Sequence, residues 1–344
     1  MKFRVTLRDI AAATGVHYST VSLALRDNPR IPPALRARIK EQAEALGYTP
    51  DPALSALNAY RKTKLRVKYQ ASLAWIDNWS GPLKLREQPT FNEYFLGATA
   101  RARQLGYEVE EFSMLQEGMT PERASRILHS RGIEGLLLAP QMNPGTWLPM
   151  NYEKFAAITF GYSLSPQAFH LVTNHQFHSM SMALEQLAAL GYRKIGLYLH
   201  EAIDEKADNG YLTGFWRFFH HHPELTSLEP CIVSKFGIDQ TLFPAWYKKH
   251  RPDVVVTDSD LPVLDWLHEA GARVPEEAGC VWLSVAEDDD FHAGIYQHGQ
   301  LIGRTAVDFL VGMLQRGERG MPETPIRMLV EGRWNPGQTL RRQI

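Results

Sequence analysis

The chain has 344 residues, 44% of them hydrophobic and 22% charged, with two cysteines and a formal net charge of −1. This length exceeds what one hydrophobic core usually serves, so several domains are expected. Cys231 and Cys280 lie far apart and lack C-x-x-C spacing, which predicts buried thiols in a reducing compartment. Residues 1–30 carry no apolar leader, and apolar runs of about 18 residues are absent, so secretion and membrane insertion are not expected.

The near-zero net charge conceals two parts of opposite charge. Residues 1–68 contain 13 Lys or Arg against 5 Asp or Glu, a net charge of +8, whereas the remainder carries −9. Such an asymmetry is typical of a chain whose one end meets phosphate groups. The alternative interpretation is a solvated basic terminus with no partner.

The first 50 residues predict a helix-turn-helix. Two short helices are expected over Val5–Ala13 and His17–Arg26, joined by a turn in which Gly15 suits a positive φ. A third helix is expected to open at Pro33 and to end at Gly47. The predicted core of this head is Leu7, Ile10, Ala11, Val16, Val21, Leu25, Leu35, Ile39, Ala43 and Leu46. In this arrangement the second helix is shaped to lie in the major groove of DNA.

These residues resemble the LacI/GalR family of bacterial transcriptional regulators. The family opening V-T-[LI]-x-D-[VI]-A-x-x-x-G-V-S-x-x-T-V-S-x-x-L is matched by Val5–Leu25, with His17 where Ser is usual. The later family pattern E-x-L-G-Y-x-P is matched by Glu44–Pro50. Weaker similarity continues through most of the chain. The resemblance implies an all-α head and hinge helix followed by an α/β body with the two-subdomain, Rossmann-like periplasmic-binding-protein fold.

The resemblance also implies which residues meet DNA. His17, Tyr18, Ser19, Ser22 and Leu23 fall where relatives place base-reading or phosphate-contacting side chains, whereas Thr6 and Thr20 would bond phosphate oxygens. Leucine has no hydrogen-bond donor, so Leu23 would at most pack on a thymine methyl, and inward packing is its alternative. The complete set of expected DNA-binding residues is Thr6, Leu7, His17, Tyr18, Ser19, Thr20, Ser22, Leu23, Arg26, Arg30, Tyr48, Ala53 and Leu57.

Pro52–Tyr60 corresponds to the hinge helix of the family. In relatives this segment folds in the minor groove, where a leucine wedges into the central base step. By register that leucine is Leu57, with Ala53 and Ala56 small enough for two such helices to approach closely. An ordinary linker helix that buries Leu54 and Leu57 is the alternative, although so short a helix would barely hold in water.

Beyond residue 68 the pattern alternates between strands and helices. Apolar runs predict strands over Ala71–Ile76, Gly135–Ala139, Phe155–Phe160, Lys194–Leu199, Asp253–Thr257 and Cys280–Leu283. Helices are predicted over Asn92–Leu105, Pro121–Ser130, His178–Leu190, Ala207–His222, Thr241–His250, Leu261–Ala270 and Gln300–Gln315. This alternation indicates parallel sheets covered on both faces.

The domain boundaries follow from these elements. We expect a DNA-binding domain over 1–50, a hinge helix and linker over 51–68, and an effector and dimerisation body over 69–344. The body is expected to divide into an N-subdomain (about 69–173 and 299–325) and a C-subdomain (about 174–298 and 326–344). Gln104–Tyr107 echoes Ala189–Tyr192, which indicates an internal duplication.

The predicted cleft between the subdomains departs from the sugar-binding pattern of the family. Thr173-Asn174 stands in place of an Asp-Asn pair, Tyr211 in place of an Arg, and Ser284 in place of an Asp, while Asp258 retains a family position. Aromatic residues remain near the strand ends and would stack a sugar ring or a flat ligand. The expected lining is Trp75, Asp77, Trp79, Tyr94, Tyr162, Asn174, Tyr211, Trp246, Asp258 and Ser284. The alternative is that these aromatics are core and the cleft binds nothing tightly.

Enzymatic function is not expected. No P-loop, G-x-S-x-G or H-E-x-x-H motif occurs. The run His220-His221-His222 is interpreted as a solvated helix end, so neither a metal nor a cofactor is expected.

The resulting hypothesis is a cytoplasmic, nucleoid-associated regulator that binds double-stranded operator DNA as a homodimer. A pseudo-palindromic operator would match the two-fold symmetry of the dimer, and a small ligand would modulate its DNA affinity. The chain ends without a leucine heptad of the kind that assembles tetramers, so a dimer is expected. Two alternatives stay open: a dimeric regulator whose body has lost ligand sensing, and an activator rather than a repressor. A periplasmic receptor would share the body but lack the head.

Replacing the predicted wedge tests the hinge interpretation. We expect Leu57→Ala to weaken specific operator binding and to reduce DNA bending, because an apolar side chain that unstacks a base step is what kinks the duplex. Gel mobility of circularly permuted operator fragments measures the bend. Unchanged bending would remove Leu57 from this role.

Overall fold

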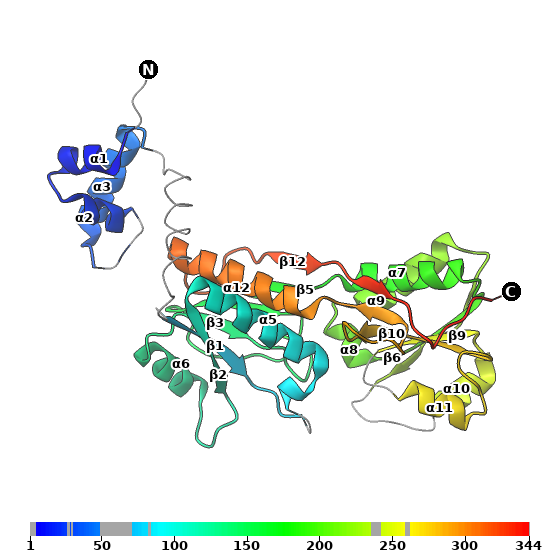
Figure 1. Ribbon diagram of the computed structural model, residues 1–344. Coiled ribbons are helices and arrows are strands. Elements are labelled where there is room, and N and C mark those ends of the chain that lie inside the picture. Colours follow the sequence, from blue (N-terminus) through cyan, green and yellow to red (C-terminus); the bar gives the residue numbers. More distant parts are fainter. Residues whose placement is uncertain are drawn as a thin grey trace.

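The computed structural model describes residues 5–25, 28, 30–48, 71–81, 84–234, 242–258 and 262–343. Arg26, Ala53, Leu57 and the rest of the predicted hinge helix lie outside the described residues. The predicted fold class is confirmed: a small all-α head precedes an α/β body that contains two sheets (Figure 1).

The head contains three helices packed around one small core. They are α1 (Leu7–Thr14), α2 (Tyr18–Ala24) and α3 (Pro33–Ala45). Gly15 has φ +67° and ends α1, which turns the chain sharply into α2. Ile10, Val21 and Ile39 contribute one fully buried side chain from each helix. Arg38 of α3 donates from Nη2 to the carbonyl of Thr14 at 2.7 Å, and so binds the last turn of α1 to the third helix.

The first sheet of the body is parallel throughout. Its order is β12-β5-β4-β3-β1-β2, from strands β1 (Ala71–Asp77), β2 (Tyr107–Ser113), β3 (Gly135–Leu138), β4 (Ala156–Phe160), β5 (His170–Asn174) and β12 (Arg327–Val330). The short 3₁₀ helix η1 (Leu85–Glu87) leads into α5 (Pro89–Leu105), which covers one face together with α12 (Gly299–Arg316). The other face is covered by α6 (Pro121–Ser130).

Glycines let α5 and α12 approach closely. A Cβ built on Gly97 would lie 2.0 Å from the carbonyl oxygen of Gln300, and one on Gly303 would lie 2.0 Å from that of Tyr94. No side chain fits at either position, so the two helices pack backbone against backbone. This contact fixes the end of α12 that lies beside the second subdomain.

The second sheet repeats the layout of the first. Its main path is β13-β11-β10-β9-β6-β7, with β8 also paired to β6. The strands are β6 (Lys194–His200), β7 (Thr226–Ser227), β8 (Cys231–Val233), β9 (Val254–Thr257), β10 (Gly279–Val285), β11 (Gly294–Tyr296) and β13 (Arg333–Asn335). Only β13 runs antiparallel to its neighbour among the pairs of this sheet in the described residues.

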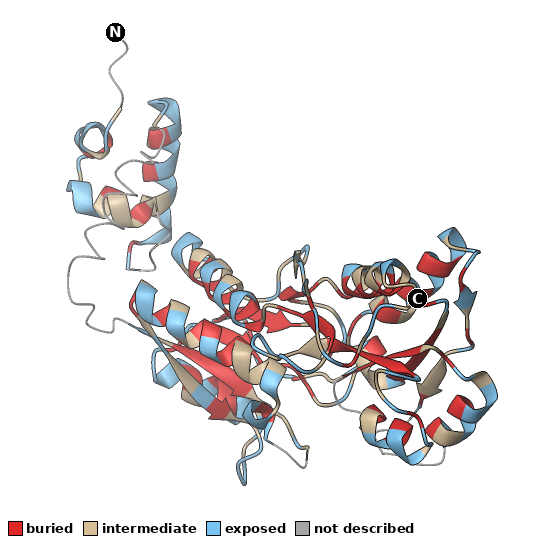
Figure 2. Cartoon of the chain, turned by 45° about the vertical axis from the view of Figure 1, so that its right-hand side comes forward, coloured by how far each residue is buried: buried red, intermediate tan, exposed pale blue. Residues whose placement is uncertain are grey.

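Helices cover both faces of the second sheet. One core contains α7 (Gln176–Ala189) and α9 (Gly210–His221), and the opposite core contains α10 (Leu242–His250) and α11 (Val263–Glu269). A short helix, α8 (Glu201–Glu205), follows β6. Figure 2 shows buried residues concentrated along the strands and exposed residues on the outer helix faces. In both sheets the strand that comes first in the chain lies second from the edge, beside the edge strand that follows it, which supports the predicted duplication.

In the part of the chain that the structure describes, the backbone crosses between the two sheets three times. The crossings lie at residue 175 between β5 and α7, at 297–298 between β11 and α12, and at 331–332 between β12 and β13. The predicted boundary at 325/326 is wrong, because Arg327–Val330 pairs with Leu171–Asn174 in the first sheet. The third crossing therefore lies directly beside the first, and the backbone N–H of His175 donates to the carbonyl of Val330 at 2.8 Å.

Two further expectations concern the cysteines and membranes. Cys280 is buried and Cys231 half-buried, both as thiols, and burial raises the pKa of Cys231 to about 11. Among the described residues no helix is long and apolar enough to cross a bilayer.

Burial of His170 predicts an acid-sensitive joint between β5 and β12. The His170 Nδ1 atom accepts the N–H of Ile326 at 2.9 Å, and burial, the largest cause, holds the pKa of this imidazole below its ordinary value of 6.5. The folded state thus binds this proton less readily than the unfolded state. Its contribution to stability is complete above about pH 6.5 and is lost as the pH falls toward the folded pKa.

We expect the melting temperature to fall between about pH 7.5 and pH 5.5, by about 1–3 °C more in the wild type than in His170→Asn. Asparagine offers an acceptor near the position of Nδ1 but does not titrate. Scanning calorimetry of both proteins at each pH measures the difference. Equal slopes would contradict this role of His170.

Candidate ligand cleft and DNA-binding head

A cleft of about 640 Å³ opens between the two sheets of the body. Its walls come from the segments that follow the carboxyl ends of strands in both subdomains, where open parallel sheets bind their ligands. This volume lies in the range of ordinary small-molecule sites, which is about 300–1,000 Å³.

A polar cluster at the floor of the cleft joins both subdomains. The hydroxyl oxygen of Tyr211 on α9 accepts hydrogen bonds from Nδ2 of Asn174 at 3.3 Å and from Nε2 of Gln297 at 3.1 Å. Gln297 also donates to the carbonyl of Leu283 at 2.7 Å. Since Asn174 and Gln297 adjoin two of the crossings, the Tyr211 hydroxyl connects the second subdomain to both. Burial raises the pKa of Tyr211 to about 12, so the phenol remains protonated.

A second amide reinforces this floor. Nε2 of Gln176 donates to Oγ1 of Thr173 at 3.0 Å and to Oδ1 of Asn174 at 3.1 Å. These three residues are nearly fully buried, and their groups are oriented by one another before any ligand arrives. Preorientation lowers the cost of binding, because less freedom is lost on association.

Aromatic rings form one wall of the cleft. Trp79, Phe91 and Tyr94 follow one another in edge-to-face contacts, with centroid separations of 5.5 and 5.9 Å. The indole N–H of Trp79 is buried and has no acceptor among the described residues. From the other subdomain, Nζ of Lys206 lies 5.5 Å over the Trp79 ring and donates to the carbonyl of Met142 at 3.2 Å. Trp282 lines the opposite wall.

The charged lining of the cleft is mainly acidic. Four carboxylates, those of Glu87, Glu93, Asp258 and Asp289, line the cleft together with the ammonium group of Lys206. Burial raises the pKa of Glu93, and the nearby carboxylate of Glu287 adds to that rise. Other groups position Asp258: its carboxylate accepts the backbone N–H of His200 at 2.8 Å and lies 3.2 Å from Nδ1 of that buried imidazole. An anionic ligand would therefore meet repulsion at several points.

Most of the predicted ligand-binding residues come together here. Those that line the cleft are Trp79, Tyr94, Tyr162, Asn174, Tyr211, Asp258 and Ser284. Ser284 lies 3.0 Å from the hydroxyl oxygen of Thr90 in the first subdomain, so the two walls touch at this point. That these residues bind a ligand stays a prediction.

Three predicted lining residues lie elsewhere. Trp75 is fully buried in the first core between Phe95 and Phe160, because its position on β1 points toward α5 and α12. Trp246 is on α10 and packs against the second sheet, where its ring lies against Gly196 of β6. Asp77 accepts the N–H of Trp79 at 2.8 Å and so supports the loop without lining the cleft.

Sequence reasoning missed several lining residues, chiefly Glu93, Lys206, Trp282 and Gln297. Gln297 directly follows the short apolar strand β11, and this signal could have identified it. Trp282 lies within β10, where an apolar run predicts a core residue. Glu93 and Lys206 lie on or beside helices whose periodicity marks them as surface positions, so no sequence signal separates them from ordinary solvated charges.

The head presents a continuous polar surface at the start of α2. His17, Tyr18 and Ser19 are exposed, and Nδ1 of His17 lies 2.8 Å from the Ser19 hydroxyl oxygen. The Thr6 hydroxyl donates to Asp9 at 2.7 Å, and this bond is the main reason that the Asp9 pKa is lowered. Leu23 is half-buried against the head core, which favours inward packing over contact with a thymine methyl.

Thus the fold defines a class of protein: a helix-turn-helix head joined to a body of two subdomains with a cleft between them. Residues 6–51 match the model of the family described as bacterial regulatory proteins, lacI family. This match confirms the resemblance to the LacI/GalR family of bacterial transcriptional regulators, whose members are not enzymes.

Curated relatives include the HTH-type transcriptional regulators MalR of Streptomyces coelicolor and reg1 of Streptomyces lividans. They are 25% and 26% identical over 200 residues, covering 56% of this chain and 53% of each relative. The chain thus spans about half the length of the curated relatives it matches.

Solved structures share the whole architecture. The transcriptional regulator CelR in complex with cellobiose has a TM-score of 0.60 and 19% identity, covering 98% of this chain and 100% of that one. The lac repressor dimer bound to operator and the anti-inducer ONPF has a TM-score of 0.57 and 18% identity, with the same coverage. At these identities the likeness establishes the fold.

Removing the Tyr211 hydroxyl tests the polar floor. We expect Tyr211→Phe to destabilise the body by about 1–3 kcal/mol, because amide N–H groups of two buried side chains lose their acceptor. A shift of about 2–4 °C per kcal/mol in melting temperature is expected for a unit of this size. Tyr162→Phe, in a half-buried ring of the same cleft, is the matched control. Equal melting temperatures for the two variants would contradict the role of the cluster.

Proposed function

We propose that this protein is a sequence-specific DNA-binding transcriptional regulator, acting as a repressor. The observation that carries the proposal is α2 of a lacI-type head, which begins with three exposed polar side chains, His17, Tyr18 and Ser19. A helix of this kind reads base edges in the major groove, while hydroxyls and cations around it bind the phosphates. The net charge of +8 over residues 1–68 supplies the electrostatic part of the binding.

The proposed operator is pseudo-palindromic and is bound by a homodimer. Two identical heads on one duplex must be related by the two-fold axis of the dimer, so the half-sites are inverted repeats. A related repressor is described as a dimer bound to operator. Because such a regulator acts on the chromosome, we place it in the cytoplasm, associated with the nucleoid.

The effector that we propose for the cleft is an uncharged sugar. Trp79, Phe91 and Tyr94 offer ring faces, and the amides of Asn174 and Gln297 offer oriented hydrogen-bonding groups. The buried N–H of Trp79 has no acceptor among the described residues and would be satisfied by a hydroxyl oxygen. The acidic lining disfavours phosphorylated sugars. A structural neighbour is described in complex with cellobiose, a neutral disaccharide.

Binding is coupled to DNA through the body. The Thr90–Ser284 contact and the position of Lys206 over Trp79 connect the two walls, so a ligand that displaces or strengthens them changes the angle between subdomains. The population of the DNA-binding arrangement then shifts by the difference in ligand affinity between the two arrangements.

Selection of operators from a random pool of duplexes tests the DNA-binding proposal. We expect one inverted-repeat motif, bound with an affinity that falls steeply with salt, because displaced counterions accompany each phosphate contact. Tyr18→Ala should change the selected bases, whereas Arg30→Ala should weaken all duplexes alike and lower the salt slope by about 1.

Failure to bind any duplex, even at low ionic strength, would overturn the regulator proposal. If DNA is bound, neutral mono- and disaccharides are screened by melting temperature and then by their effect on operator affinity, with sugar phosphates as the charged comparison. A ligand that binds only in phosphorylated form would contradict the effector class and leave the DNA-binding assignment standing.

A further inference from the structure

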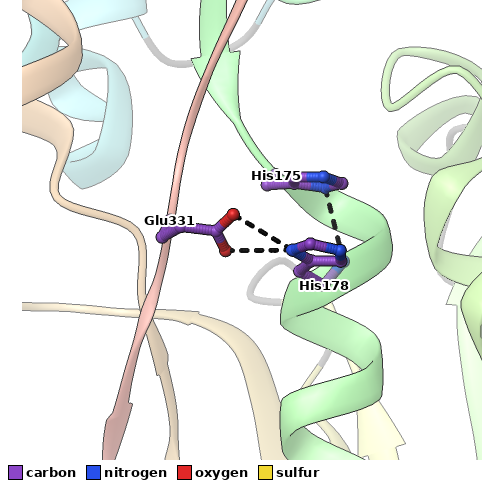
Figure 3. A group of neighbouring side chains, drawn as sticks. All are labelled: His175, His178 and Glu331. Atoms are coloured by element: carbon purple, nitrogen blue, oxygen red, sulfur yellow. Dashed lines mark hydrogen bonds and ion pairs between the residues drawn. The ribbon is translucent and has the colours of Figure 1, made fainter.

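Three metal-ligating side chains meet on the outer side of the crossings between the subdomains. His175 is the residue of the first crossing, Glu331 belongs to the third, and His178 lies in the first turn of α7 (Figure 3). A potential ligand atom from each of the three lies within 4.8 Å of those of the other two. The cluster is separate from the cleft, since none of the three residues lines it.

The three side chains already contact one another, and one side of the cluster faces solvent. Nδ1 of His178 lies 3.0 Å from one carboxylate oxygen of Glu331 and 3.2 Å from the other. The rings of His175 and His178 stack with centroids 3.7 Å apart. Nδ1 of His175 accepts the backbone N–H of His178, which leaves its Nε2 as the ligand atom.

The stacked rings must tilt to direct their nitrogens at one ion. His178 has 52% of its side chain exposed and Glu331 has 59%, so both have room to rotate. His175 is held by the backbone at the N-terminus of α7 and would be the fixed member of the set. Water would complete the coordination from the solvent side.

We propose that His175, His178 and Glu331 bind one divalent transition-metal ion of the zinc type. Two imidazoles and one carboxylate form a donor set suited to Zn²⁺ at about 2.0–2.2 Å, whereas Mg²⁺ and Ca²⁺ require oxygen ligands. Few other atoms need to move, because the backbone bond from His175 to the Val330 carbonyl already holds the two crossings together.

An ion at this position restrains the hinge. Closure of two subdomains is absorbed by changes in φ and ψ at a few residues between them, and two of the three ligands are such residues. The third, His178, moves with the second subdomain on α7. A bound ion therefore fixes the first turn of α7 to the third crossing and slows opening of the backbone bond between His175 and Val330.

Titration of the full-length, metal-depleted protein with Zn²⁺ against a chromogenic chelator tests the site. We expect one ion per chain at the site. We also expect His178→Ala and Glu331→Gln each to weaken the affinity at least about tenfold, since the first removes one of three ligands and the second removes the negative charge of another. Both residues are exposed, so neither change endangers the fold.

The matched control is His220→Ala combined with His221→Ala, which removes surface imidazoles on α9 from a different part of the body. This variant should retain the affinity of the wild type. In hydrogen exchange, Zn²⁺ should slow the His175 amide in the wild type and in the control, but not in His178→Ala.

Three outcomes would overturn the proposal. They are no Zn²⁺ uptake by the wild type, equal affinity in the wild type and the ligand variants, and loss of uptake in the control alone. The last would assign binding to the histidine run of α9. None of these measurements requires DNA or an effector, so their failure is distinct from failure of the proposed function.

Discussion

The arrangement of the body depends on three backbone crossings that lie close together between its two sheets. Strand β12 returns to the first sheet beside β5, so the first and third crossings are joined by a main-chain hydrogen bond before any side chain contributes. Because each subdomain has its own sheet and its own cores, relative motion has to be absorbed at these few residues. The geometry of the cleft, and of everything in it, is set there.

Side chains control the crossings from two opposite sides. On the cleft side, the Tyr211 hydroxyl accepts amides that adjoin two crossings, in a nearly dry environment where a lost partner is costly. On the solvent side, His175, His178 and Glu331 connect two of the crossings to α7, and the last two of these side chains are exposed. The first set is fixed by burial and lines the cleft. The second set faces solvent. Two separate groups of side chains thus contact the same few backbone residues.

Much of the fold was predictable because the buried parallel strands are continuous apolar runs. All six predicted strands are present, and the helices on both faces were found at nearly their true bounds. Strand β5 was missed because His170 and Asn174 make it polar at both ends, and β12 because its side chains are half exposed and do not form an apolar run. Placing β12 required its partner β5, which no local pattern reveals.

The site was predictable where a residue directly follows a predicted strand, as Asp258 follows β9, because the carboxyl ends of parallel strands meet at one edge of the sheet. Asn174 is the last residue of β5, a strand that was not predicted, and only the family resemblance placed it in the cleft. The site was not predictable where the direction of a side chain decides whether that side chain reaches the cleft. Trp75 and Trp79 are both close to the end of β1. Trp75 is within the strand, where side chains alternate between the two faces of the sheet, and its side chain enters the core. Trp79 lies past the end of the strand, so this alternation does not apply to it. Glu93 is on α5 and reaches the cleft only because Gly97 and Gly303 bring α5 against α12. A long-range helix contact thus places a charge that its own helix marks as solvent-facing. The acidic lining of the cleft is therefore a property of the packing rather than of any local motif.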